Sequence, residues 1–430
     1  MRKFLLLTIS ILTMLTACSK YDDPFGNEDP KIEDPEVAER TVLVYVAAEN
    51  NLDYYLDYDL EEMKVGSSQL GDDQNLVIYV NRADTSSTPY MARVYRGNLV
   101  DKVFMPEAIA ADPTVLSLVL NKTRELYPAK SYGLVLWGHC SGWLISDQTW
   151  KTKAYGGSTG DNTKESVGKY WMNYPDLADA IYSAMKGDKL NFIFGDCCNF
   201  ASIEAAYELR NVADYIIGSP AEIPDKGAPY DICVQDFFLD DTDFYHQLID
   251  HYYYYWQDVY NRSDKAYIYY NMSPGDLAGY SVPLVAIKSS ELENLAAATS
   301  NLLSTISDKV RRNGSLDLDS TLYYACYIKF RHSHDMNLVF KKNAAVQDYL
   351  TWKAFFEKTV CYAVHSANWL SANRYLCYDM EDFVGIPGSD CGSVSMFFPS
   401  SKYDYTSPDW NKAIGQFQWN DVIHWEQYGW

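Results

Sequence analysis

Two short segments place thiols, and in one of them also an imidazole, at the ends of apolar runs. One segment reads YGLVLWGHCSG and places His139 and Cys140 directly after its apolar part. The other reads LNFIFGDCC and ends in Cys197 and Cys198. A thiolate attacks a carbonyl carbon, and an imidazole takes the thiol proton and later protonates a leaving amine. These residue types predict nucleophilic acyl transfer with Cys198 and His139 as the reacting pair.

Apolar runs that alternate with helical patterns would position this pair. The runs lie at residues 41–47, 75–80, 91–96, 132–137, 190–195 and 215–219. Helical patterns lie between them, at 112–126, which opens with Asp-Pro, and at 175–186. Strands alternating with helices predict an α/β fold with a mainly parallel sheet. Catalytic groups of such sheets gather at the carboxyl ends of the strands, where both reactive segments are expected.

The local setting of Cys198 suggests how its thiol becomes reactive. A helix is expected to start at this residue, and the positive end of a helix lowers the pKa of a thiol. The backbone amides of Cys198 and Cys140 are candidate donors for the oxyanion. The alternative is that Cys198 is a small buried apolar residue. Cys197 is expected to point to the opposite face and pack inside.

The two segments resemble the signature of the clostripain family of cysteine peptidases, which shares its fold with the caspase and gingipain group. That signature has one strand ending in His-Gly and another ending in Asp-x-Cys, followed by Ala-Ser-x-Glu. Here the second motif reads DCC at 196–198 and ASIE at 201–204. The resemblance extends through VLVYVAAENNLD, IIGSPAEIPDKGAPYD and GSVSMFFP, so it covers most of the chain.

The resemblance implies an endopeptidase on a caspase-like three-layer α/β/α sandwich with a C-terminal α+β extension. It makes Cys198 the nucleophile and His139 its partner, with proteins or peptides as substrates. It also makes Asp196 the acidic floor of a pocket for Arg or Lys, although an Asp in this place could instead cap a helix. The family's glycine after the histidine is replaced by Cys140, whose side chain would occupy a crowded rim.

The long polar segment 146–170 separates two of the predicted strands. The resemblance implies self-cleavage in this segment, and its lysines are the candidate sites: Lys151, Lys153, Lys164 and Lys169. The alternative is an exposed insertion that no protease needs to cut.

The first residues carry an export signal. Arg2 and Lys3 precede an apolar run, and the sequence LTAC ends at Cys18. Cleavage before Cys18 would leave its thiol for acylation, so the protein is expected in the cell envelope, held by lipid in the outer membrane and facing the periplasm or the cell surface. The alternative is an ordinary cleaved signal.

The expected organisation is signal peptide 1–17, acidic tether 18–39, catalytic domain 40–222 and a C-terminal region 223–430 that completes the same unit. A strand at 393–399 is expected to return to the main sheet.

Composition excludes some partners and leaves others open. The chain has 58 Asp and Glu against 36 Lys and Arg, a net charge of −22, which repels nucleic acid. The sequence contains no Cys-x-x-Cys or His-x-x-x-His spacing, which would predict a bound zinc ion. Acyl transfer needs no cofactor. The resemblance makes calcium a candidate ligand, because some members of the family depend on it. The main alternative function is a binding or scaffolding lipoprotein that keeps the peptidase fold without turnover. A sugar-binding role would rest only on the aromatic run HYYYYW at 251–256.

Overall fold

The computed structural model describes most of the chain from residue 37 onward. It describes residues 37–84, 86–144, 155–158, 170–239, 244–262, 277–313, 316–318, 321–327, 330–367, 369, 391–404 and 409–428. All of them belong to one compact unit, residues 37–430. The expected signal peptide and Cys18 lie outside the described residues.

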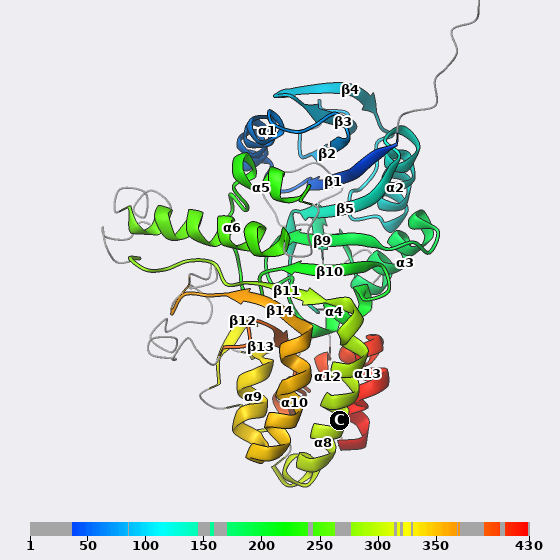
Figure 1. Cartoon of the computed structure of the whole chain (residues 1–430). Helices are drawn as coiled ribbons and strands as arrows, with labels where there is room; N and C mark the ends of the chain where they lie inside the picture. Colours follow the sequence, from blue (N-terminus) through cyan, green and yellow to red (C-terminus); the bar gives the residue numbers. More distant parts are fainter. Residues whose placement is uncertain are drawn as a thin grey trace, which may run out of the picture. The chain divides into compact units, whose positions relative to one another are not determined.

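A nine-stranded sheet runs through this unit (Figure 1). From one edge to the other its strands are β14 (Val360–Val364), β11 (Leu284–Lys288), β10 (Ala213–Gly218), β9 (Leu190–Asp196), β5 (Ala129–Trp137), β1 (Ala38–Ala48), β2 (Gln74–Arg82), β3 (Tyr90–Tyr95) and β4 (Asn98–Phe104). The central strands from β10 to β2 are parallel, whereas antiparallel pairs extend both edges. The predicted α/β fold with a mainly parallel sheet is confirmed.

Side chains of the central strands alternate between two apolar layers. In β1, Leu43 and Tyr45 join one buried cluster, while Val42 and Val44 join the other. This alternation follows from the two-residue period of a strand, and it explains why the central strands are apolar almost throughout. The sheet is therefore covered on both faces, as a three-layer α/β/α sandwich requires.

Helices form the two outer layers. The layer on the Val42 side contains α1 (Asp53–Ser67), α5 (Tyr230–Asp236) and α6 (Phe244–Asn261). The layer on the Leu43 side contains α2 (Pro113–Leu126), α3 (Tyr174–Met185) and α4 (Ile203–Leu209). The same buried cluster continues into the C-terminal helices, which gather past the β14 edge in Figure 1: α8 (Leu292–Asn313), α9 (Met336–Asn343), α10 (Val346–Thr359), α12 (Trp410–Ala413) and α13 (Gln418–Ile423). Short 3₁₀ turns accompany them: η1 (Ser289–Glu291), η4 (Ser401–Tyr403), η5 (Ile414–Gln416) and η6 (Trp425–Tyr428).

Local sequence explains where the helices of the predicted patterns begin. Helix α2 starts where Asp112 accepts a hydrogen bond from the Thr114 amide at 2.8 Å, with Pro113 in its first turn. The aromatic run HYYYYW lies in α6, where Tyr252 and Trp256 are buried and Tyr254 is exposed. Tyr252 and Trp256 of this run therefore belong to the core. No helix in the described ranges combines the length and apolar character needed to cross a bilayer.

The C-terminal half extends the main sheet through strands other than the expected one. Strands β11 and β14 join its edge, whereas β15 (Ser395–Met396) pairs with β13 (Phe330–Asp335) in a separate sheet that also holds β12 (Tyr323–Tyr327). The expectation that 393–399 returns to the main sheet is therefore wrong. The reason is that the Phe397 amide donates to the buried Glu204 carboxylate at 2.7 Å, which ties this segment to α4.

Candidate active site

The reactive segments leave two neighbouring parallel strands at matched positions. Trp137 at the end of β5 is paired with Asp196 at the end of β9. His139 and Cys198 each lie two residues beyond this pair, so both emerge at the same edge of the sheet. Strand β1 lies on the other side of β5 and also ends at this edge. The loop from β1 to α1 contains Asn51. Figure 1 shows β1, β5 and β9 side by side.

Close backbone packing holds the two reactive loops together. Gly142 has φ +70°, and a Cβ at this position would lie 3.2 Å from the Asn199 carbonyl oxygen. Asn199 itself adopts φ +56°, and its amide donates to the Ala221 carbonyl at 2.8 Å. The loop after β10 thus joins the histidine and cysteine loops at one place.

Cys198 is followed by a loop and not by a helix. Helix α4 begins at Ile203, with Ser202 as its capping residue, so the expectation that a helix N-terminus activates the thiol is wrong. The Cys198 Sγ instead accepts a hydrogen bond from the Ile223 amide at 3.4 Å and lies 3.9 Å from the Ile223 carbonyl oxygen. Burial and the nearby Glu222 carboxylate raise the pKa of this thiol far above its usual range. The resting thiol is therefore protonated.

His139 is held by an asparagine. Its Nε2 lies 2.8 Å from the Asn51 Oδ1, and in the described part of the chain no hydrogen bond joins it to Cys198. The ring keeps part of its surface exposed, yet desolvation lowers its pKa to about 4. The imidazole is thus neutral at pH 7, like the thiol.

Asp196 lies under the loop after β10. Its carboxylate accepts hydrogen bonds from the Ala228 amide at 3.0 Å, the Tyr230 hydroxyl at 2.8 Å and the Tyr252 hydroxyl at 3.3 Å. It does not cap a helix, because Ser202 does so, and that interpretation is wrong. Burial raises the pKa of Asp196 to about 6, against the opposing effect of these donors.

Comparison with known proteins places this arrangement in a family. The sequence model of the clostripain family matches residues 44–425. The chain belongs to the clostripain family. It is therefore a cysteine peptidase, a hydrolase that acts on proteins or peptides.

Solved structures of clostripain-family proteases share this fold. A secreted C11 cysteine protease from Bacteroides thetaiotaomicron, bound to an irreversible peptide inhibitor, is 28% identical with a TM-score of 0.71, covering 91% of this chain and all of that one. An inactive zymogen C11 protease from Parabacteroides distasonis is 24% identical (TM-score 0.66; 90% of this chain and 99% of that one). A second secreted C11 protease from Bacteroides thetaiotaomicron, called iotapain, is 18% identical (TM-score 0.63; 88% and 100%). None of the curated proteins compared with the chain matches it.

The departure from the clostripain-family pattern at Cys140 is accommodated in the core. Cys140 is buried, and its Sγ lies 3.2 Å from the Tyr174 hydroxyl. The expectation that this side chain crowds the rim is wrong, because it points inward from β6 (His139–Cys140). Cys197 is buried in the same cluster, as expected, and burial raises the pKa of its thiol.

Acidic side chains of α1 lie next to Asp196 in this peptidase. Asp59 accepts a hydrogen bond from the Trp137 Nε1 at 2.6 Å, and burial together with the charge of Asp196 raises its pKa to about 9. Glu62 accepts from the Tyr230 amide at 3.2 Å, and burial together with the charge of Asp231 raises its pKa to about 7. The sequence did not indicate this cluster, because acids in a helix that also exposes Asp57 and Glu61 read as a solvated face.

The predicted cleavage segment contributes a strand beside the histidine. Strand β7 (Tyr155–Ser158) pairs with β6 on one side and with β8 (Tyr170–Met172) on the other, and Gly156 is the partner of His139. The four candidate lysines of this segment, Lys151, Lys153, Lys164 and Lys169, lie outside the described residues.

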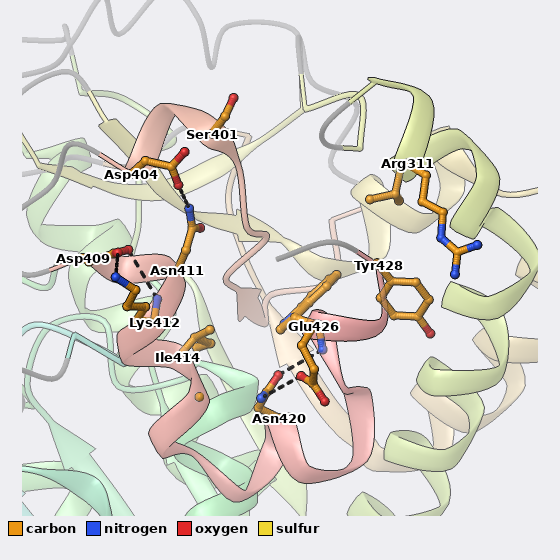
Figure 2. Close-up of a pocket in the computed structure, with 13 residues that line it drawn as sticks. Arg311, Ser401, Asp404, Asp409, Asn411, Lys412, Ile414, Asn420, Glu426 and Tyr428 are labelled. Atoms are coloured by element: carbon orange, nitrogen blue, oxygen red, sulfur yellow. Dashed lines mark hydrogen bonds and ion pairs between the residues drawn. The ribbon is translucent and has the colours of Figure 1, made fainter.

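A cavity of about 680 Å³ lies apart from the thiol and imidazole, in the C-terminal half (Figure 2). Its lining comes from α8 and the last segments of the chain, and neither Cys198 nor His139 contributes. Polar groups of the lining pair with one another, as Asp409 does with Lys412 at 3.1 Å and Asn411 with Asp404 at 2.8 Å. The pairing satisfies these groups within the chain, so the cavity is not assigned to the peptidase reaction.

Proposed function

We propose that Cys198 is the nucleophile of this peptidase and His139 its general base and acid. The observation that carries the proposal is the strand register: both residues lie two positions beyond the paired Trp137 and Asp196, on adjacent parallel strands. Groups placed in this way meet at the carboxyl edge, where parallel sheets bind their ligands.

The proposed reaction uses these two side chains, two amides and water. The Cys198 proton passes to His139 while a bond forms between Sγ and the carbonyl carbon, and the amides of Cys198 and Cys140 hold the oxyanion. The C–N bond then breaks as the imidazolium protonates the leaving amine. Water, deprotonated by His139, hydrolyses the thioester and restores the thiol. These steps require no cofactor, and calcium remains a candidate ligand outside them.

Burial sets the order of the first step. It disfavours both the thiolate and the imidazolium, as the raised pKa of Cys198 and the lowered pKa of His139 show. We therefore propose that proton transfer accompanies attack on the bound substrate, so that a separated ion pair does not form in the free enzyme.

We propose cleavage after Arg or Lys. Asp196 lies two residues before Cys198, and its pKa of about 6 leaves its carboxylate mostly charged at pH 7, so it contributes negative potential near the thiol. A buried carboxylate discriminates strongly in favour of a cationic side chain, because a neutral side chain leaves the charge uncompensated.

Reporter peptides with Arg, Lys, Asp or a neutral residue before the scissile bond test this preference, with protein that lacks residues 1–18. We expect turnover after Arg or Lys, and we expect Asp196→Asn to lower kcat/KM for those reporters about 10- to 100-fold. Asp225→Asn, which changes an exposed acid in the loop after β10 that covers Asp196, is the matched control.

Two results would count against this function. Equal turnover of all reporters would remove the proposed role of Asp196. No turnover of any reporter, even after deliberate cleavage of the 146–170 segment, would favour the binding or scaffolding alternative.

We propose self-cleavage of the 146–170 segment at one or more of Lys151, Lys153, Lys164 and Lys169. The position of β7 beside His139 supports a link between this segment and the site. After a cut on either side of β7, its hydrogen bonds to β6 and β8 would hold the strand in place, so a nicked chain is expected to stay assembled.

We propose that acylated Cys18 anchors the protein in the cell envelope, with 18–39 as the tether, 40–222 as the catalytic domain and 223–430 completing the unit. The proposed site is the outer membrane, facing the periplasm or the cell surface; two relatives are described as secreted. Cys18→Ser is expected to move the protein from the membrane fraction to the soluble fraction and to abolish labelling by a fatty-acid analogue. Equal labelling and partitioning of both forms would contradict the anchor.

A further inference from the structure

The turn after β1 presents one polar side chain to the catalytic histidine. Asn50 is fully buried, donates to the Ala47 carbonyl at 2.9 Å and accepts from the Leu52 amide at 2.9 Å. Directly after Leu52, α1 starts at Asp53, which forms a 2.7 Å ion pair with Arg82. The turn is therefore fixed on both sides of Asn51.

Asn51 is exposed, and the imidazole of His139 is the only hydrogen-bond partner of its side chain in the described ranges. An exposed asparagine gains little by bonding to another side chain when water is available. A 2.8 Å contact between the Asn51 Oδ1 and the His139 Nε2, across 88 residues of sequence, therefore indicates a role beyond stability.

The chemistry of the contact determines where the histidine can accept a proton. An amide oxygen only accepts hydrogen bonds, so a contact through Oδ1 assigns the hydrogen to Nε2. The lone pair of the neutral imidazole is then on Nδ1. A base for the Cys198 thiol needs a free lone pair directed at Sγ, and fixing the hydrogen on Nε2 reserves Nδ1 for that task.

We propose that Asn51 is a positioning residue of the peptidase reaction, which holds the His139 ring in place and fixes its tautomer through the Oδ1 to Nε2 contact. The inference rests on the proposed catalytic role of His139. The same contact would also stabilise the imidazolium that forms during attack, because Nε2 donates to Oδ1 in both protonation states.

A charge introduced at position 51 tests the proposal, because it should change the pKa of His139. Desolvation is the cause of the lowered pKa of His139, and no charged group of the described residues adds to it. A carboxylate at position 51 would be the first charge to act on this ring. Asn51→Asp is therefore expected to raise the pKa of His139, whereas Asn51→Ala removes the acceptor without adding charge.

The experiment compares these two variants with the parent enzyme in kinetics and in proton NMR titration of the imidazole. Asn51→Ala is expected to lower kcat about 10- to 100-fold with KM nearly unchanged. Asn51→Asp is expected to retain more activity than Asn51→Ala, and the acidic limb of its kcat/KM profile should move up by about one pH unit or more. Asn121→Ala and Asn121→Asp, on the exposed face of α2, provide matched controls.

The two readouts separate the possible failures. Unchanged kcat and pH profile in both Asn51 variants of an active enzyme would overturn the positioning role. In a second outcome, kcat falls only in step with a lower unfolding midpoint, and the pH profile is the same in both variants. That outcome would give Asn51 a role in stability alone and would also overturn the positioning role. If the parent enzyme shows no turnover dependent on Cys198, the proposed function fails, while an unshifted imidazole titration in Asn51→Asp would independently reject the contact.

Discussion

Cys198→Ala is expected to lower kcat for peptide hydrolysis by roughly 10⁴-fold or more. The thiol is the group that forms the covalent bond in the proposed route, and alanine offers no substitute. Only direct attack by water would remain, assisted by the amides that bind the oxyanion. The variant is measured with the Arg reporter at saturating substrate and by mass after treatment with a peptide inhibitor that alkylates thiols.

Cys197→Ala is the control for this experiment because it removes the neighbouring thiol from a buried position. It is expected to cost stability but to keep both turnover and labelling. Cys198→Ala is also expected to remain one uncut chain, since self-cleavage would need the same thiol. If labelling survives in Cys198→Ala and disappears in Cys197→Ala, the nucleophile is Cys197 and the assignment to Cys198 is wrong.

Much of this scaffold could be predicted because its information is local. The strands follow from apolar runs, and α2 follows from Asp112 and Pro113 at its start. The convergence of His139 and Cys198 also follows, since parallel strands have their carboxyl ends at one edge. The partner of β15 could not be predicted in this way, because two residues carry no register signal and a tertiary contact with Glu204 decides their place.

The finer features of the site depend on contacts that no local pattern contains. Phe200 continues the apolar spacing of Ile203 and Tyr207, so the sequence pattern predicts a helix that starts earlier than α4 does. The structure prevents a helix there by the positive φ of Asn199 and its bond to Ala221. Asn51 carries no local signal in the segment VLVYVAAENNLD, and its contact with His139 arises only because β1 and β5 pair.

The loop that carries Cys198 is fixed by an aromatic ring seated on glycines. Phe200 is fully buried, and its ring lies against Gly195 of β9 and Gly218 of β10. A Cβ at Gly195 would be 2.2 Å from the ring, and one at Gly218 would be 2.8 Å from it. These are far below normal contact distances, so the two glycines create the space in which the ring fits.

Gly195→Ala is therefore expected to displace the Phe200 ring, to destabilise the fold by about 1–3 kcal/mol and to lower kcat/KM by roughly 10- to 100-fold. Steric overlap is the cause, since Gly195 does not have a positive φ. Gly415→Ala is the control, because its nearest neighbour would lie 3.8 Å away. The measurements are urea unfolding and turnover of the Arg reporter.

A double-mutant cycle with Phe200→Leu separates overlap from other causes. The smaller side chain leaves a gap of its own, so Phe200→Leu alone should be destabilising. Combined with Gly195→Ala, it removes the ring that the new methyl group would strike, and the double variant should be more stable than the sum of the single effects by about 1 kcal/mol or more. Strict additivity would contradict the seating of Phe200 on Gly195. Recovery of turnover together with stability would link this seat to the position of Cys198, two residues away.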